Sequence, residues 1–103
     1  MKVSINNIDV ELKYTMRSLM IYEKIYGKTF QPEGLSEMLV YFYSTILASD
    51  KNIKLTFNEF IDYIDENPNL LNDFAAWLGK ATEVNKYVKN EDEQPEENPD
   101  PNV

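Results

Sequence analysis

The side chains in this sequence that could do chemistry are carboxylates, lysines, tyrosines and hydroxyls, because the chain has no histidine and no cysteine. Asp62 and Glu66 are four residues apart and would share one face of a helix, where two carboxylates can act as a general acid and a general base. The sequence supplies no oriented third group and no glycine-rich phosphate loop to accompany them. We therefore interpret the pair as part of a solvated helix face and predict a non-enzymatic protein with no catalytic residues and no cofactor.

A second set of oxygen ligands has the spacing of part of a calcium-binding EF-hand loop. With Glu59 as the bidentate twelfth ligand, Asp50 and Asn52 take the third and fifth positions. The first position is then Ala48, and Ile53 stands where the loop needs its turn glycine. The sulfur and imidazole ligands of zinc sites are absent as well. No metal site is predicted.

The charge of the chain is concentrated at its C-terminal end. The formal net charge is −8, and residues 90–103 contain six acidic side chains and no basic one, so residues 1–89 carry only −2. Residues 90–103 also contain three prolines and no apolar residue before Val103, and such a composition cannot repay the entropy of ordering. We predict one domain over 1–89 and a disordered acidic tail over 90–103. A nearly neutral domain with an acidic tail argues against nucleic acid as a partner.

Apolar and polar residues alternate along residues 1–14, which predicts a β-hairpin with a two-residue turn at Asn6 and Asn7. One face of this hairpin is apolar and must pack on the helices, because a lone hairpin is marginal in water. The start of the chain has the alternating pattern of a strand and lacks that of a signal peptide, so a cytosolic location is expected. The predicted register pairs Ile5 with Ile8, Val3 with Val10, Met1 with Leu12, Lys2 with Glu11 and Ser4 with Asp9.

The next predicted element is a helix over residues 16–26, with Thr15 as its N-cap and Gly27 after its last turn. Arg17 and Lys24 lie on the side expected to face solvent. Ile21 and Ile25 lie on the flank, where polar residues are expected, so they are either interface residues or covered by the hairpin. The side expected to face the core contains Met16, Leu19, Met20, Tyr22 and Tyr26.

The most apolar stretch is residues 35–49, LSEMLVYFYSTILAS, which has one formal charge and predicts the central helix. Its length of roughly 22 Å is too short for a bilayer core, so no membrane span is predicted. The strip with Glu37 and Ser44 is expected to face water. Two apolar stripes run along the helix: Leu35, Leu39, Phe42 and Ile46 form the first, and Val40, Tyr43 and Leu47 form the second.

Two further helices are predicted in the C-terminal half. Thr56 and Glu59 have the spacing of a capping box, and Leu55 and Phe60 that of the accompanying hydrophobic staple. The last helix is expected to have Asn67 as N-cap and Pro68 as its first residue. A heptad-like seam follows along it: Leu70, Phe74, Trp77, Ala81, Val84 and Val88.

The predicted fold is α+β and mostly α, with an N-terminal β-hairpin followed by about four helices in a small bundle. Thirteen aromatic side chains in 103 residues exceed what the core of so small a domain needs, and aromatic residues suit protein interfaces. The heptad-like seam of the last helix is either part of an interface or, in its first half, packed on the core. The candidate interface residues are Ile21, Ile25, Val40, Tyr43, Leu47, Trp77, Val84 and Val88.

The order of these segments, with the sequences LMIYEKIYGK and FIDYIDENP, resembles the small tail assembly chaperones of long-tailed bacteriophages and prophages of Gram-positive hosts. The resemblance covers about residues 1–80. It implies a non-enzymatic protein of the bacterial host cytoplasm that binds the long, helical, aggregation-prone tape measure protein before the tail tube polymerises. It also implies a longer form of the protein made by ribosomal frameshifting, as a further partner. No single binding residue transfers from the family.

A hypothesis of a different class is a small adaptor or structural protein of a phage or mobile element that self-associates. The hairpin edge or the seam from Leu70 to Val88 would form the contact in a homo-oligomer. A helix-turn-helix regulator is disfavoured, because no helix has a cluster of basic residues.

Overall fold

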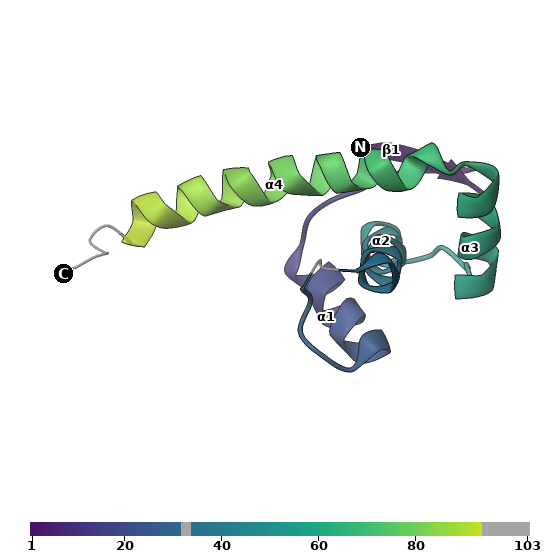
Figure 1. Ribbon diagram of the computed structural model, residues 1–103, viewed down its shortest axis with the longest axis horizontal. Coiled ribbons are helices and arrows are strands. Elements are labelled where there is room, and N and C mark those ends of the chain that lie inside the picture. The colour runs from purple at the N-terminus through teal and green to yellow at the C-terminus, as the bar shows by residue number, and fades with distance from the viewer. Residues whose placement is uncertain (32–33, 94–103) are drawn as a thin grey trace.

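The computed structural model describes residues 1–31 and 34–93, and the side chains of these residues as far as residue 82 (Figure 1). An antiparallel β-hairpin is followed by four helices, which confirms the predicted α+β, mostly helical fold. Helix α4 ends at Glu93, four residues beyond the predicted domain boundary. The rest of the predicted tail, residues 94–103, lies outside the described residues. The elements are β1 (Lys2–Ile5), β2 (Ile8–Glu11), α1 (Met16–Tyr26), α2 (Leu35–Ser49), α3 (Phe57–Glu66) and α4 (Asn69–Glu93).

The hairpin has the predicted register, with Val3 opposite Val10 and Ile5 opposite Ile8. Asn6 and Asn7 have φ values of 52° and 63°, the left-handed conformation that a tight two-residue hairpin turn requires. The Leu12 amide donates to the Met1 carbonyl at 2.8 Å and extends the ladder by one pair. The apolar face is buried except at Ile8, which lies next to the turn and stays 39% exposed.

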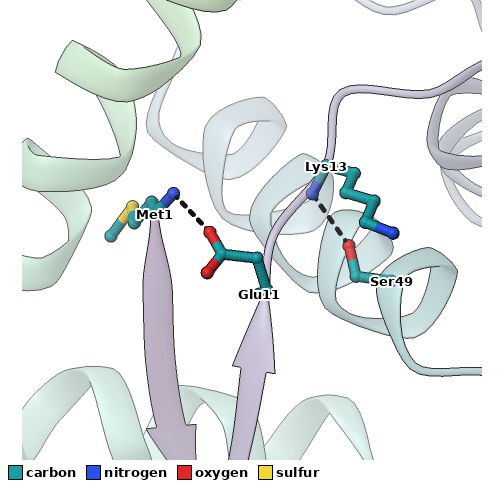
Figure 2. A network of polar contacts seen from close by, with 4 residues as sticks. All are labelled: Met1, Glu11, Lys13 and Ser49. Atoms are coloured by element: carbon teal, nitrogen blue, oxygen red, sulfur yellow. Dashed lines mark hydrogen bonds and ion pairs between the residues drawn. The ribbon is translucent and has the colours of Figure 1, made fainter.

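Polar contacts fix the open end of the hairpin (Figure 2). The Met1 amine donates to Glu11 Oε2 at 3.0 Å, across the two strands. The Lys13 amide donates to Ser49 Oγ at 3.1 Å, which ties the chain leaving β2 to the C-terminal end of α2. Because the ion pair is exposed, it contributes little stability.

Helix α2 is the centre of the core, as its composition predicts. The Phe42 ring stacks on Phe74 of α4, with ring centres 4.2 Å apart, and meets Phe60 of α3 edge-on at 5.2 Å. Ser44 was predicted to face water and is fully buried instead. Its hydroxyl donates to the Val40 carbonyl at 2.7 Å, so the helix backbone satisfies it without water. Leu35, in the first turn, is 66% exposed rather than part of the buried stripe.

The capping box of α3 is confirmed: Thr56 Oγ1 accepts from the Glu59 amide at 3.1 Å, and Glu59 Oε1 accepts from the Thr56 amide at 2.9 Å. Asn67 ends α3, since its backbone amide donates to the Ile64 carbonyl and its side-chain Nδ2 donates to the Tyr63 carbonyl. Its own carbonyl accepts from the Leu70 amide of α4, but its side chain does not cap that helix. Helix α4 begins at Asn69, one residue after the predicted first position.

Helix α4 extends well beyond the other elements. In Figure 1 its N-terminal half lies over the body of the molecule, and its C-terminal half runs away from it with no other element beside it. The molecule measures 50 × 26 × 25 Å, and its radius of gyration of 15.7 Å exceeds the roughly 13 Å of a compact domain of about 100 residues. Within the described helices, none is both long and apolar enough to cross a membrane.

Candidate protein-binding face

Helix α1 is held to the core by an aromatic cluster on its inner side. The Tyr22 ring is fully buried and lies 5.3 Å from Tyr26, 5.0 Å from Phe30 and 6.1 Å from Tyr41 of α2, between ring centres. Phe30 also stacks on Tyr41 at 4.2 Å. Such contacts add to the burial of the rings themselves and give α1 one fixed orientation.

Ser18 is the second buried residue of the inner side. Its amide donates to Thr15 Oγ1 at 3.1 Å, and its own hydroxyl accepts from the Thr15 amide at 3.4 Å, so the two residues form a capping box. The Ser18 hydroxyl also donates to the Thr15 carbonyl at 2.6 Å and lies 2.8 Å from the Tyr41 hydroxyl. This buried serine is therefore paired with a second buried hydroxyl, that of Tyr41.

The consequence is that the side of α1 that faces the core is rotated from the predicted one. Tyr22 is buried, and Leu19 and Tyr26 pack against the core, as predicted. Met16 and Met20, predicted to be inside, are 72% and 64% exposed. At 100° per residue, the centre of the buried side lies about 90° from the centre of the predicted one. The physical reason is that the Ser18 hydroxyl pairs with the Tyr41 hydroxyl, while the Tyr22 ring packs among other aromatic rings, so the side of α1 with these two residues faces the core.

The outer face of α1 is a shallow depression with an apolar centre and charged flanks. Met16 and Met20 stand one turn apart, and contiguous exposed apolar side chains of this kind mark interaction sites more often than scattered ones do. Arg17 and Lys24 are exposed beside them. The described residues that line the depression are Met16, Arg17, Met20, Ile21, Glu23 and Lys24.

The two predicted interface residues of α1 lie at the edge of this face. Ile21 is half-buried and lines the depression, and Ile25 is 48% exposed. The helix ends at Gly27 with φ 84°, and the Gly27 amide donates to the Glu23 carbonyl at 2.8 Å. Both ends of α1 are thus capped, so the helix presents its outer face on a fixed frame.

The other predicted interface residues do not join this surface. Val40 is buried, which corrects its prediction as a client contact, because the chain's own elements cover that side of α2. Tyr43 is half-buried, and its ring meets Phe57 of α3 edge-on at 5.4 Å. Leu47 and Trp77 are half-buried and pack against the core. The side chains of Val84 and Val88 lie outside the described ones.

Met16 and Met20 are the residues that pattern reasoning missed as surface candidates. A usable signal was present in the sequence, because a capping box needs the N-cap and the residue three positions later. Thr15 and Ser18 have that spacing, and serine can take the second role through its hydroxyl. Recognising Ser18 as a capping residue would have placed the inner side of α1 near Tyr22.

The described titratable groups with altered pKa values are four buried or half-buried tyrosines. Burial raises the pKa of Tyr41 above 10.0, and the hydrogen bond with Ser18 opposes that rise. Burial and the nearby Glu37 carboxylate raise the pKa of Tyr22, whose buried hydroxyl has no hydrogen-bond partner among the described atoms. Neither group lines the outer face of α1.

A more polar depression lies between the hairpin turn and α3. It contains the carboxylates of Glu59, Asp62 and Glu66 beside Asn6 and Asn7. No group of three or more acidic side chains in the described part of the chain has the arrangement needed to hold a metal ion. These carboxylates form an acidic surface, as predicted for Asp62 and Glu66.

Comparisons with protein-family models, with curated proteins and with solved structures found no match. The interpretation of the outer face of α1 therefore rests on the residues of this chain and on the resemblance noted from its sequence.

Proposed function

We propose that this protein is a non-enzymatic phage tail assembly chaperone, which binds the tape measure protein and keeps it soluble while the tail assembles in the cytoplasm of the bacterial host. The observation that supports this most directly is the pair of exposed methionines, Met16 and Met20, on the outer face of a helix capped at both ends. The order of the sequence segments, which resembles these chaperones, supports it independently.

The physical requirements of the task match this surface. A long helical client shows apolar side chains at i, i+3, i+4 and i+7, and a partner covers them with an apolar face of its own. Methionine suits a surface that must accept many such segments, because its unbranched side chain adapts to different shapes. The net charge of −8 would keep the loaded complex soluble. A frameshifted longer form would display the same α1 face and act on the same client.

Co-expression with the tape measure protein tests the proposal. The wild-type chain is expected to move the tape measure protein into the soluble fraction and to co-purify with it. A Met16→Gln, Met20→Gln double variant should lose most of this effect, since it removes the apolar centre without disturbing the core. Leu35→Gln is the matched control, because Leu35 is exposed to the same degree on another helix. If the tape measure protein stays as insoluble with the wild-type chain as without it, the proposal is wrong.

A self-associating adaptor or structural protein is the second candidate. It is favoured by the two-stranded sheet, in which each strand has one neighbour and one open edge among the described elements. Ile8 is exposed at its turn end, and open strand edges can pair across a two-fold axis. Light scattering separates the two candidates: a dimer whose mass does not change when the tape measure protein is added favours the structural role.

A further inference from the structure

We propose that the outer face of α1 selects amphipathic helices that carry carboxylates beside their apolar stripe. This inference deepens the proposed function and rests on it, because it names the chemistry of the client segment. It goes beyond an apolar contact by assigning a role to the exposed cations that line the depression, Arg17 and Lys24.

The first support is the distribution of charge. Residues 13–28 contain four basic side chains and one acidic side chain, a net charge of +3, whereas the whole chain carries −8. The rest of the chain therefore carries −11, and α1 with its flanks is a basic segment on an acidic protein. Complementary charge across an interface gives specificity and raises the rate of association.

The second support is the arrangement of the cations around the methionines. Met16, Met20 and Lys24 follow one another at four-residue steps, so they form one row along the helix. Arg17 and Ile21 form the neighbouring row, and all five residues line the same depression. A helix lying on this face would meet an apolar centre with cations along one side and the Glu23 carboxylate on the other. The complementary helix has apolar side chains at i and i+4, with Asp or Glu next to them.

The acidic segments of this chain fit the face less well. Residues 94–103 contain no apolar residue before Val103 and three prolines, so they offer no helical stripe to cover the methionines. The acidic side of α3 in a second copy also lacks an apolar stripe. Its outermost apolar residue, Phe57, packs against Tyr43.

An anionic membrane surface is disfavoured by the same charges. Segments that bind anionic lipid typically present a cluster of four to eight Lys or Arg side chains on one surface. Arg17 and Lys24 are the two basic side chains on the described outer face. The rest of the chain is acidic, so an anionic membrane would repel it.

Binding of two synthetic helical peptides to the full-length chain tests the inference. Both peptides carry the same apolar stripe, and they differ only in having glutamate or lysine beside it. At low salt the glutamate peptide is expected to bind roughly tenfold more tightly, since two exposed cations attract glutamate and repel lysine. This preference should shrink as salt is added.

The matched variants locate the effect. Arg17→Glu with Lys24→Glu should reverse the preference toward the lysine peptide, with the helical circular dichroism signal unchanged. Lys51→Glu with Lys54→Glu makes the same change in net charge on exposed residues of another segment, and it should leave the preference intact. Equal binding of both peptides, or loss of the preference in both variants alike, would overturn the inference.

Four further results would overturn the inference or separate it from the proposed function. Binding of the glutamate peptide only after removal of residues 94–103 would make the chain's own tail the occupant, and binding to anionic vesicles in place of peptides would make the partner lipid; either result overturns the inference. If the tape measure protein is kept soluble while neither peptide binds, the inference fails and the proposed function stands. If the glutamate peptide binds as expected while the tape measure protein stays insoluble, the proposed function fails and the assigned helix chemistry stands.

Discussion

The hydroxyls of Ser18 and Tyr41 lie 2.8 Å apart, and both residues are fully buried between α1 and α2. Ser18 fixes the first turn of α1 through its capping box with Thr15. Its contact with Tyr41 turns the same side of the helix toward the core. The exposure of Met16 and Met20 follows from that orientation. A buried polar pair on one side of the helix thus leaves the two methionines of the opposite side exposed.

Ser18→Ala is expected to lower the free energy of unfolding by about 1–3 kcal/mol, because it leaves the Tyr41 hydroxyl buried without this partner and removes half of the capping box. Urea unfolding followed by circular dichroism measures the change. Tyr41→Phe should cost less, since the Ser18 hydroxyl keeps its bond to the Thr15 carbonyl. In the double variant the losses should be less than additive; strict additivity would show that the two hydroxyls are not coupled.

Alkaline pH is expected to destabilise the fold. Burial raises the pKa values of Tyr22, Tyr41, Tyr43 and Tyr63 above 10.0, so the unfolded chain releases these protons at lower pH than the folded chain does. The contribution of these tyrosines to the free energy of unfolding should be constant below pH 10 and should fall as the pH rises above it. Urea midpoints measured across this range, with tyrosinate absorbance, check the prediction. Tyr41→Phe should reduce the slope, and a tyrosinate titration of the native protein centred at 10 for all seven tyrosines would contradict it.

Gly27→Ala is expected to destabilise the protein by about 1 kcal/mol, since Gly27 has φ 84° and an alanine is strained there. The cost is conformational, because an added Cβ would meet no atom within 4 Å. Gly27→Asn should cost less, since asparagine tolerates the left-handed conformation. Thermal unfolding of both variants makes the comparison, and equal losses would point to a cause other than backbone conformation.

Thr56→Ala should cost about 1 kcal/mol by removing the side-chain cap of α3. Chemical denaturation measures this, and Asn58→Ala in the same first turn is the control, since Asn58 is exposed and has no capping role. A loss in the control as large as that in Thr56→Ala would mean that helix propensity, rather than the cap, sets the stability of this turn.

Local signals in the sequence were enough to place the elements. The alternation of residues 1–14 predicted the hairpin and its register, and the spacing of Thr56 and Glu59 predicted the start of α3. The composition of residues 35–49 predicted the bounds of α2. Each of these signals depends on neighbours in the chain, which is why each could be derived without tertiary structure.

The orientation of helices within the core was harder to predict. Ser44 was assigned to water together with Glu37, yet its hydroxyl finds a partner inside the protein. Ser18 was given no role, although its hydroxyl pairs with that of Tyr41. Val40 was proposed as an interface residue because the sequence could not decide whether the first helix and the hairpin or a client covers the second stripe of α2. Satisfied buried hydroxyls and the identity of a covering element are properties of the assembled fold, and periodicity alone does not show them.

The extension of α4 beyond the body has a practical consequence for hydrodynamic measurements. A molecule of 12.1 kDa that measures 50 × 26 × 25 Å diffuses more slowly than a sphere of equal mass, so a single copy should elute early in size-exclusion chromatography. An elution volume calibrated with globular standards would therefore overstate the mass of a monomer.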